Sequence, residues 1–223
     1  MRLSWLTPCV LVFACGAEST TIGRVNPHTD GGVGELVAAA DASLDSSTAD
    51  APSCTIPGYP SGPYGVLQGN TMSPQPSWQG YLGATQIIVS PTDYWDPSQC
   101  KGAAALFVVE VDATDPTSVD VTNLIAQNLA GPWANGRVRV LELLTRSVNG
   151  TPATLSDVQA FQQAHGVTWT IAADPSETYQ DMSGFYPQIR LVVDTCTMII
   201  TRWVHRDPVD TDATTLGARL TCP

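Results

Sequence analysis

The chain has 223 residues, a length that suggests one folded domain with appended segments rather than two full domains. Its hydrophobic content of 43% is enough for a sizeable core. The formal net charge is −11, and the ten basic residues form no run. This balance argues against a nucleic-acid partner, because phosphate binding requires clustered Lys and Arg.

The N-terminus has the pattern of an export signal. Arg2 supplies a positive charge, and the apolar stretch Leu3–Ala14 is too short to span a bilayer but long enough for a signal peptide. Its end, Val12-Phe13-Ala14-Cys15, resembles the lipobox of bacterial lipoproteins. The resemblance implies a signal peptide at 1–14, a lipid on Cys15, and attachment to a membrane of the bacterial cell envelope, expected to be the outer membrane. A plain secretory signal, with Cys15 incidental, is the alternative.

Residues 15–53 are predicted to be the lipidated cysteine followed by a disordered linker. Between residues 16 and 53 there is no aromatic residue, and six acidic residues stand against one basic residue. Such a segment buries too little apolar surface to offset the entropy lost on ordering. The folded domain is therefore placed at 54–223, roughly 35 Å from the lipid by random-coil scaling.

Four cysteines remain in this domain, namely Cys54, Cys100, Cys196 and Cys222. Export to an oxidising compartment favours disulfides. Four cysteines allow three pairings, and their spacing does not choose among them.

Strands of an α/β domain follow the Pro- and Gly-rich segment CTIPGYPSGPYG, which predicts turns. The near-continuous apolar run from Ala103 to Val111 is typical of a strand covered on both faces. The predicted strands, in chain order, are Gln86–Ser90, Ala103–Val111, Val138–Leu144, Val167–Ala172, Ile189–Asp194 and Met198–Val204.

Three helices are predicted between and after these strands. The first begins at Asp115-Pro116, a residue suited to an N-cap followed by a proline suited to the first turn. Together the elements predict parallel βαβ units with an antiparallel hairpin at one edge of the sheet. The predicted helices run from Asp115-Pro116 to Gly131-Pro132, from Thr154 or Ser156 to Gly166, and from Asp210 or Asp212 to Leu220.

This order of elements resembles the thioredoxin fold over residues 64–221, and within it the redoxin and peroxiredoxin-like lipoproteins and the periplasmic thiol-disulfide oxidoreductases. Three stretches add to the resemblance. YPSGPYG with Gly69-Asn70-Thr71 is similar to the lead into an N-terminal hairpin, Tyr186-Pro187 stands where the family keeps a cis-proline, and Asp194-Thr-Cys-Thr-Met198 is similar to the family's Asp-x-x-x-Met hairpin. The resemblance implies an α/β three-layer sandwich, with a central mixed sheet and an N-terminal extension.

The family places a Trp-Cys-x-x-Cys motif where the first central strand meets its helix, because the helix N-terminus lowers the pKa of the first thiol. With Ala113 matched to the alanine before that motif, Pro116 and Val119 fall at the two cysteine positions. No cysteine lies between residues 100 and 196, and the peroxiredoxin Pro-x-x-x-Thr-x-x-Cys pattern is absent as well.

Residues Asp115, Pro116, Thr117, Ser118 and Val119 are therefore interpreted as a vestigial active-site corner. Proline has no nucleophile, and a helix dipole worth about 0.3–1 kcal/mol cannot turn the hydroxyl of Thr117 or Ser118 into the equivalent of a thiolate. Thiol-disulfide and peroxide chemistry are excluded at the usual place.

Two further residues belong to the predicted corner. Glu110 stands three residues before Ala113, where thioredoxins often carry a buried carboxylate. It is either a relic proton acceptor with a raised pKa or, the interpretation we favour, a strand-end carboxylate that reaches solvent or pairs with an arginine. Tyr186 flanks Pro187 and is expected to face the vacated pocket.

The resemblance also implies where the cysteines lie. In a thioredoxin topology Cys100 and Cys196 are at the end of the sheet opposite the corner, which favours the bridges Cys100–Cys196 and Cys54–Cys222. A relocated redox pair is the rival interpretation, although no two cysteines have the close spacing of a reactive dithiol.

No metal or other cofactor is expected. His28, His165 and His205 are scattered without ligand spacing. Asp207, Asp210 and Asp212 lack the glycine and the terminal glutamate of a calcium loop, so capping of the last helix is the preferred explanation.

Two functions remain open. The first is a non-catalytic envelope lipoprotein that serves as a binding or scaffold module for an unidentified envelope protein or peptide. Its groove would lie between residues 114–119 and Tyr186-Pro187, where an extended peptide can meet a backbone edge. The alternative is a redoxin-type thiol-disulfide oxidoreductase or peroxidase that uses non-standard cysteines. The fold does not decide between them.

Overall fold

The structure is a computed structural model that describes residues 57–179, 189–205, 211–219 and 222. All described elements lie within the unit Ala49–Pro223. Several predicted features lie outside the described residues: the signal peptide, Cys15, the linker, Cys54, His28, Tyr186-Pro187, Asp207 and Asp210. Among the described helices, none combines the length and the apolar character that crossing a bilayer requires.

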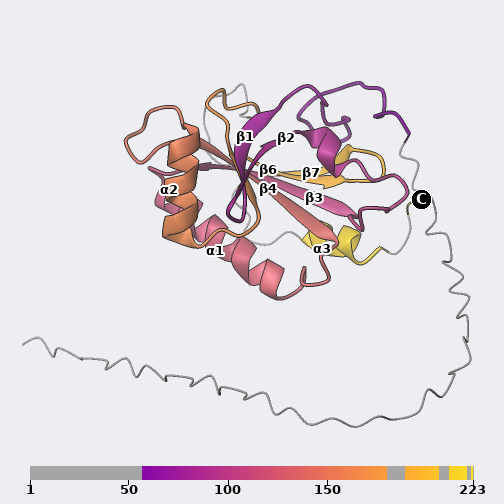
Figure 1. Cartoon of the computed structure of the whole chain (residues 1–223). Coiled ribbons are helices and arrows are strands. Elements are labelled where there is room, and N and C mark those ends of the chain that lie inside the picture. Colours follow the sequence, from indigo (N-terminus) through magenta and orange to yellow (C-terminus); the bar gives the residue numbers. More distant parts are fainter. Residues whose placement is uncertain (1–56, 180–188, 206–210, 220–221, 223) are drawn as a thin grey trace, which may run out of the picture. The chain divides into compact units, whose positions relative to one another are not determined.

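The described strands form one seven-stranded mixed sheet in the order β2-β1-β5-β4-β3-β6-β7 (Figure 1). The central strands β3, β4 and β5 are parallel, and all the other neighbours are antiparallel. The bounds are β1 Trp78–Leu82, β2 Thr85–Val89, β3 Ala105–Asp112, β4 Val138–Arg146, β5 Thr170–Ala173, β6 Ile189–Asp194 and β7 Ile199–His205.

Three α-helices and one short 3-10 helix accompany the sheet: η1 Pro91–Tyr94, α1 Pro116–Ala130, α2 Leu155–His165 and α3 Thr211–Gly217. The predicted helix starts are confirmed for α1 and α2. The Asp115 side chain accepts a hydrogen bond from the Thr117 backbone N–H, and Thr154 forms a reciprocal capping box with Asp157. Gly166 ends α2 in the left-handed conformation, which glycine adopts without steric cost.

Some bounds differ from the predictions. Strand β1 was not predicted, because Gly80 interrupts its apolar pattern; that glycine lets β1 approach β5, since a Cβ atom there would lie 2.1 Å from the carbonyl oxygen of Ile171. Strand β5 begins at Thr170 rather than Val167. Helix α3 ends at Gly217 rather than Leu220. At Gly217 a Cβ atom would lie 2.6 Å from a methyl carbon of Val138.

Apolar side chains fill both faces of the sheet. All three α-helices contribute to the core on one face, which includes Val109, Ile125 and Phe161. On the other face, η1 and irregular segments cover a second core that includes Trp95, Leu141 and Tyr179. In Figure 1, α1 and α3 run below the strands and η1 lies above them.

The connections identify the fold. Strands β3 and β4 are parallel and joined by α1, the β6–β7 hairpin pairs with the other side of β3, and α3 follows. The unit α2–β5 and the hairpin β1–β2 extend the sheet beyond β4. This arrangement confirms the predicted α/β architecture, including the antiparallel hairpin at one edge of the sheet. The fold is thioredoxin-like.

Candidate functional site

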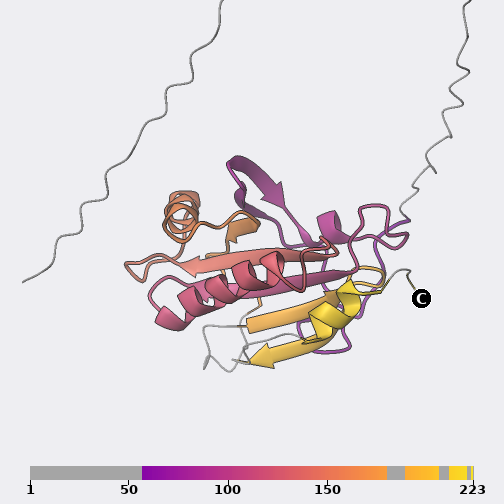
Figure 2. The ribbon, with the colours of Figure 1, turned by 90° about the horizontal axis from the view of Figure 1, so that it is seen from below.

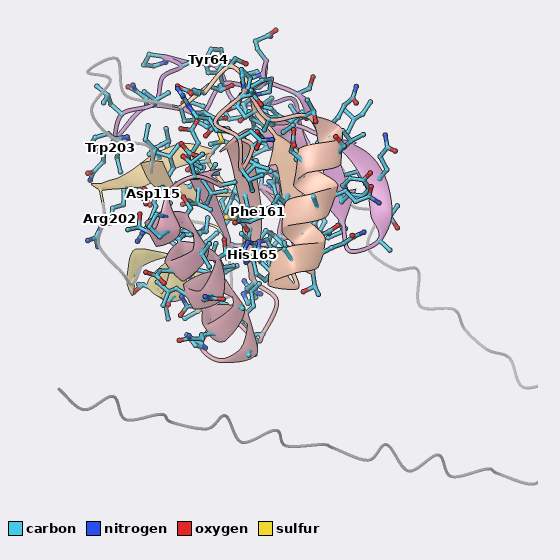
Figure 3. The ribbon with its side chains drawn as sticks, turned by 90° about the vertical axis from the view of Figure 1, so that its left-hand side faces the viewer. Tyr64, Asp115, Phe161, His165, Arg202 and Trp203 are labelled. Atoms are coloured by element: carbon cyan, nitrogen blue, oxygen red, sulfur yellow. A yellow bond between two sulfur atoms is a disulfide. The ribbon has the colours of Figure 1, made fainter. Side chains whose placement is uncertain are left out.

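The corner between β3 and α1 is the candidate functional site of this fold. One oxygen of the Asp112 carboxylate accepts hydrogen bonds from the backbone N–H and the hydroxyl of Thr114, both at 2.7 Å. The backbone N–H of Asp112 in turn donates to the Ser118 hydroxyl at 2.9 Å. The chain therefore turns sharply out of the sheet, and α1 begins with its N-terminus at the surface, as Figure 3 shows for Asp115.

The five predicted corner residues differ in accessibility. Pro116 and Thr117 are exposed, and Asp115 and Val119 are half-buried. Ser118 is fully buried, and its hydroxyl braces the turn. The buried serine is out of reach of a substrate, and the residue exposed at the start of the helix is a proline. Among the described residues, the corner therefore combines a capped helix start with an exposed proline at the first position of α1.

Glu110 lies on β3 beneath this corner and is only 2% exposed. Its carboxyl group accepts a hydrogen bond from the Tyr179 backbone N–H at 2.6 Å, and a side-chain hydrogen bond joins it to Asp174. Burial raises its pKa to about 8. The favoured prediction was a carboxylate that reaches solvent or pairs with an arginine. Its solvent-reaching form was wrong, because the chain after β5 folds back over the sheet and covers this end of β3, and the described groups that act on Glu110 include no arginine.

Asp174 is the second member of the buried pair and is fully buried. Its carboxylate accepts from the Thr178 backbone N–H at 2.7 Å and from the Thr178 hydroxyl at 2.8 Å. Because burial raises the pKa of Glu110 to about 8, the Glu110 carboxyl group carries a proton at neutral pH.

Tyr179 closes the pair off from solvent. Its ring packs against Trp78, with 5.9 Å between centroids, and its pKa is raised by burial. Its hydroxyl is buried and has no hydrogen-bond partner among the residues that the structure describes. At the rim of this region, Arg146 forms an ion pair with Glu177 at 2.9 Å and so holds the segment that covers Glu110.

A third buried carboxyl group lies on the opposite face of the sheet, under α1. Glu142 of β4 lies 2.6 Å from the Thr122 hydroxyl and accepts from the Trp169 indole N–H at 2.7 Å. Burial raises its pKa to about 7. Because its contact with Thr122 joins β4 to α1, Glu142 helps to hold α1 against β4.

The sequence analysis did not identify Asp174, Tyr179 or Glu142. Asp174 directly follows a parallel strand, and the carboxyl ends of such strands are where sites in α/β sheets form. That position could have identified Asp174 as a candidate site residue from the sequence. Glu142 stands in the apolar run of β4, and a single acid in a doubly covered strand is a usable signal as well.

The cysteines lie at the other end of the sheet. In the register of β3 and β6, Ala105 pairs with Asp194, so the β6–β7 turn is at the start of β3. The disulfide in that turn joins Cys196 to Cys222, with Cα atoms 5.6 Å apart. The predicted pairings Cys100–Cys196 and Cys54–Cys222 were therefore wrong. Cys100 is also disulfide-bonded.

A salt bridge explains the corrected pairing. Two guanidinium nitrogens of Arg219 donate to the Asp194 carboxylate, at 2.6 and 2.8 Å. Arg219 follows α3, so this bidentate contact brings the C-terminal segment beside the β6–β7 turn, and Cys222 follows three residues later. The predicted pairing assumed that strand ends alone decide which cysteines meet.

No group of three or more potential ligand residues that could hold a metal ion occurs within the described ranges. His165 belongs to the last turn of α2, and its ring packs on Phe161 with 4.4 Å between centroids (Figure 3). The side chains of His205 and Asp212 are not among those described.

Comparisons with known proteins find no matching family model and no matching curated protein. Solved structures do match. A Chlorobium tepidum protein assigned as the thiol:disulfide interchange protein DsbE is 14% identical, with a TM-score of 0.48 over 69% of this chain and 96% of that chain. Peroxidoxin BcpB from Mycobacterium tuberculosis is 12% identical, with a TM-score of 0.45 over 67% of this chain and 95% of that chain.

A third similar structure is the thioredoxin domain of a thiol-disulfide oxidoreductase from Bacteroides vulgatus. It is 15% identical, with a TM-score of 0.44 over 63% of this chain and 90% of that chain. These similarities concern the fold only. The function of the corner depends on its own residues.

The carboxyl pair Glu110–Asp174 is buried under the corner, and the exposed residues above it are Thr114, Pro116 and Thr117. All three cysteines among the described residues are in disulfides. The exposed side of the corner presents the hydroxyl groups of Thr114 and Thr117 and the N-terminus of α1.

Proposed function

We propose that this protein is a non-catalytic thioredoxin-fold lipoprotein of the bacterial cell envelope, which binds an extended segment of another envelope protein or peptide at the corner between β3 and α1. One observation carries the proposal. Pro116 occupies the exposed first position of α1, where the reactive thiol of the fold is expected, and the only buried hydroxyl of the corner, that of Ser118, supports the turn.

Two features of the corner suit it to binding. The exposed residues Thr114, Pro116 and Thr117 stand at the N-terminus of α1, whose dipole favours an acceptor group on a ligand. Strand β7 runs from the turn near Cys196 back toward the corner, and its residues Arg202 and Trp203 lie level with Phe107 and Val108 of β3. Trp203 is half-buried against the second core, and the accessible part of its ring is the aromatic surface that we propose for contact with the ligand.

The proposed location rests on two observations. The disulfide Cys196–Cys222 and the bonded Cys100 support an oxidising compartment, where disulfides form and persist. The lipobox-like stretch that ends at Cys15 supports a lipid anchor, and the outer membrane is the proposed site of attachment.

The first experiment tests catalysis. We expect no free thiol in the purified protein under non-reducing conditions, and insulin reduction and peroxide consumption at background rates. Reduction of a disulfide by a mild dithiol, together with turnover in either assay, would establish the alternative of a redoxin-type oxidoreductase with non-standard cysteines.

The second experiment tests binding. A library of extended peptides is screened against the immobilised protein. Binding of the captured peptides to the Thr117→Arg variant is then measured. Because residue 117 is exposed at the proposed groove, the arginine should weaken capture at least tenfold. Gln127→Arg, exposed near the other end of α1, is the matched control and should leave capture unchanged. Equal capture by both variants would rule out the corner as the binding surface.

A further inference from the structure

The outer edge of β2 is one end of the seven-stranded sheet. Strand β2 pairs with β1 in regular register from Trp78↔Val89 to Leu82↔Thr85, without a bulge. In Figure 2 the β1–β2 hairpin stands on the side of the sheet away from β7. Among the described residues, no strand or loop pairs with the outer edge of β2.

Hairpin geometry determines which backbone groups of β2 face outward. The two-residue loop makes Leu82 and Thr85 a hydrogen-bonded pair, and such pairs alternate along an antiparallel ladder. Ile87 and Val89 therefore bond to β1, whereas the N–H and C=O groups of Gln86 and Ile88 point away from it. The edge presents two donors and two acceptors at regular spacing.

The outer edge of β7, at the other end of the sheet, is covered by another segment of the chain. The segment before β1 bonds to β7, with the Gly69 N–H donating to the Ile200 carbonyl at 2.8 Å and the Ile200 N–H donating to the Asn70 carbonyl at 2.9 Å. A register shift between Val192 and Val193 further breaks the regularity of the β6–β7 ladder. Cover and bulges are the usual protections against edge-to-edge association.

The β2 edge has none of these protections. Residues 78–90 include no charged residue and no proline, in a chain that has 31 charged residues, 10 basic and 21 acidic. Ile88 is 73% exposed and Leu82 is 51% exposed. An uncovered, regular, uncharged edge with exposed apolar side chains is a template for another strand.

We propose that β2 pairs with β2 of a second copy of this chain, in antiparallel orientation, about a two-fold axis through Ile87. In this register Gln86 of each copy lies opposite Ile88 of the other, so the outward groups of both residues are satisfied at once. The pairing joins two sheets into one continuous sheet.

Charge argues for a second copy as the occupant. Each copy has a net charge of −11, so approach of two copies is opposed over most of the surface. The uncharged hairpin is where two copies meet without placing like charges opposite each other. The edge is also self-complementary, because a five-residue antiparallel strand centred on Ile87 matches itself after a two-fold rotation.

The size of the edge makes the dimer a reversible one. A five-residue edge buries less than the roughly 1,200 Å² of total surface typical of stable complexes. The full chain has a mass of 23.6 kDa, and we expect dimer only at concentrations on the order of 100 µM or above. Added salt should favour the dimer by screening the net charge.

The test is sedimentation of the full chain over a concentration series, with variants of the outward positions. Ile88→Pro removes an outward N–H at an edge position, where proline is tolerated, and should weaken dimerisation at least tenfold. Gln86→Lys should do the same, because it places two ammonium groups on one face across the axis. Gln86→Glu should also be monomeric, and an equal mixture of the two variants should dimerise again.

Val148→Lys is the matched control, since Val148 is 74% exposed in the loop after β4 and lies outside the hairpin. It should leave dimerisation unchanged. The proposal is overturned if the parent chain is monomeric at all concentrations, if Gln86→Lys dimerises as the parent does, or if mixing the two Gln86 variants restores nothing. The mixture keeps the test decisive even if Ile88→Pro fails to fold.

Discussion

At the scale of single residues, Glu142 is the most informative side chain. The one hydroxyl hydrogen of Thr122 has two acceptors in reach, the Ser118 carbonyl at 3.1 Å and Glu142 at 2.6 Å. If Glu142 carries the proton, it donates to Thr122, Thr122 donates to Ser118, and every group is satisfied. The raised pKa of Glu142, about 7, and the hydrogen-bond geometry therefore agree on a neutral side chain below that pH.

The sign of the pH dependence follows from this. In the unfolded chain a glutamate ionises near its ordinary pKa of 4.5, whereas the folded pKa values of Glu142 and Glu110 are about 7 and about 8. Between these limits the native state holds more protons than the unfolded state. The free energy of unfolding therefore falls as pH rises from about 4.5, by up to about 1.4 kcal/mol per pH unit for each group.

Glu142→Gln tests this account. The amide is neutral at every pH and can donate to Thr122 while accepting from Trp169. The variant should match the parent near pH 5 and be more stable by about 2–3 kcal/mol at pH 8. Urea unfolding at pH 5, 6, 7 and 8 measures the difference. Parallel pH profiles for variant and parent would mean that Glu142 does not titrate in this range.

At the scale of elements, Gly80 shows how one residue positions a strand. Strand β1 approaches β5 so closely that a Cβ atom at residue 80 would lie 2.1 Å from the Ile171 carbonyl oxygen and 2.6 Å from the Ala172 Cα atom. Both are backbone atoms of a central strand and cannot yield as a flexible side chain does. The glycine is therefore what allows β1 to join the sheet.

Gly80→Ala should accordingly lower the free energy of unfolding by about 2 kcal/mol or more. Thermal and urea unfolding measure the loss. Gly102→Ala is a useful comparison, because residue 102 has open space around it but a positive φ of 73°, so its cost is one of backbone strain alone. Equal stability of Gly80→Ala and the parent would show that β1 shifts without cost.

The elements also show what the sequence can and cannot predict. Asp115-Pro116, Thr154 and Gly166 identify helix ends, because capping depends on neighbouring residues, and the apolar runs of β3, β4 and β6 identify the central strands. Strand β1 could not be predicted, because its glycine has meaning only against β5. The positions of Glu110 and Asp174 gave usable signals, but their pairing could not be predicted, because it depends on where the segment after β5 crosses the sheet.

At the scale of the whole molecule, the chemistry divides between the two ends of the sheet. The corner with its buried carboxyl pair is at one end, and the Cys196–Cys222 disulfide with the Arg219–Asp194 ion pair is at the other. The disulfide therefore fastens the C-terminal segment to the β6–β7 turn far along the strands from the corner. From this position we expect the disulfide to stabilise the domain.

Removing that bridge measures its contribution. The double variant Cys196→Ser with Cys222→Ser opens a loop defined by a sequence separation of 26 residues. It should lose about 3–4 kcal/mol in the free energy of unfolding, by the chain-entropy model. Urea unfolding measures the loss, and peptide capture at the corner at temperatures below the transition should be unchanged. Undiminished stability would mean that Arg219 and Asp194 alone hold the segment.

The pairing of β1 with β5 has a consequence for the order in which the molecule assembles. Tyr81 pairs with Ile171, 90 residues later in the chain. An isolated two-stranded hairpin is marginal in water, so β1–β2 gains lasting stability only once β5 has taken its place beside β4. Contacts at such separation close slowly. The strands that come first in the sequence are therefore among the last to be secured in the sheet.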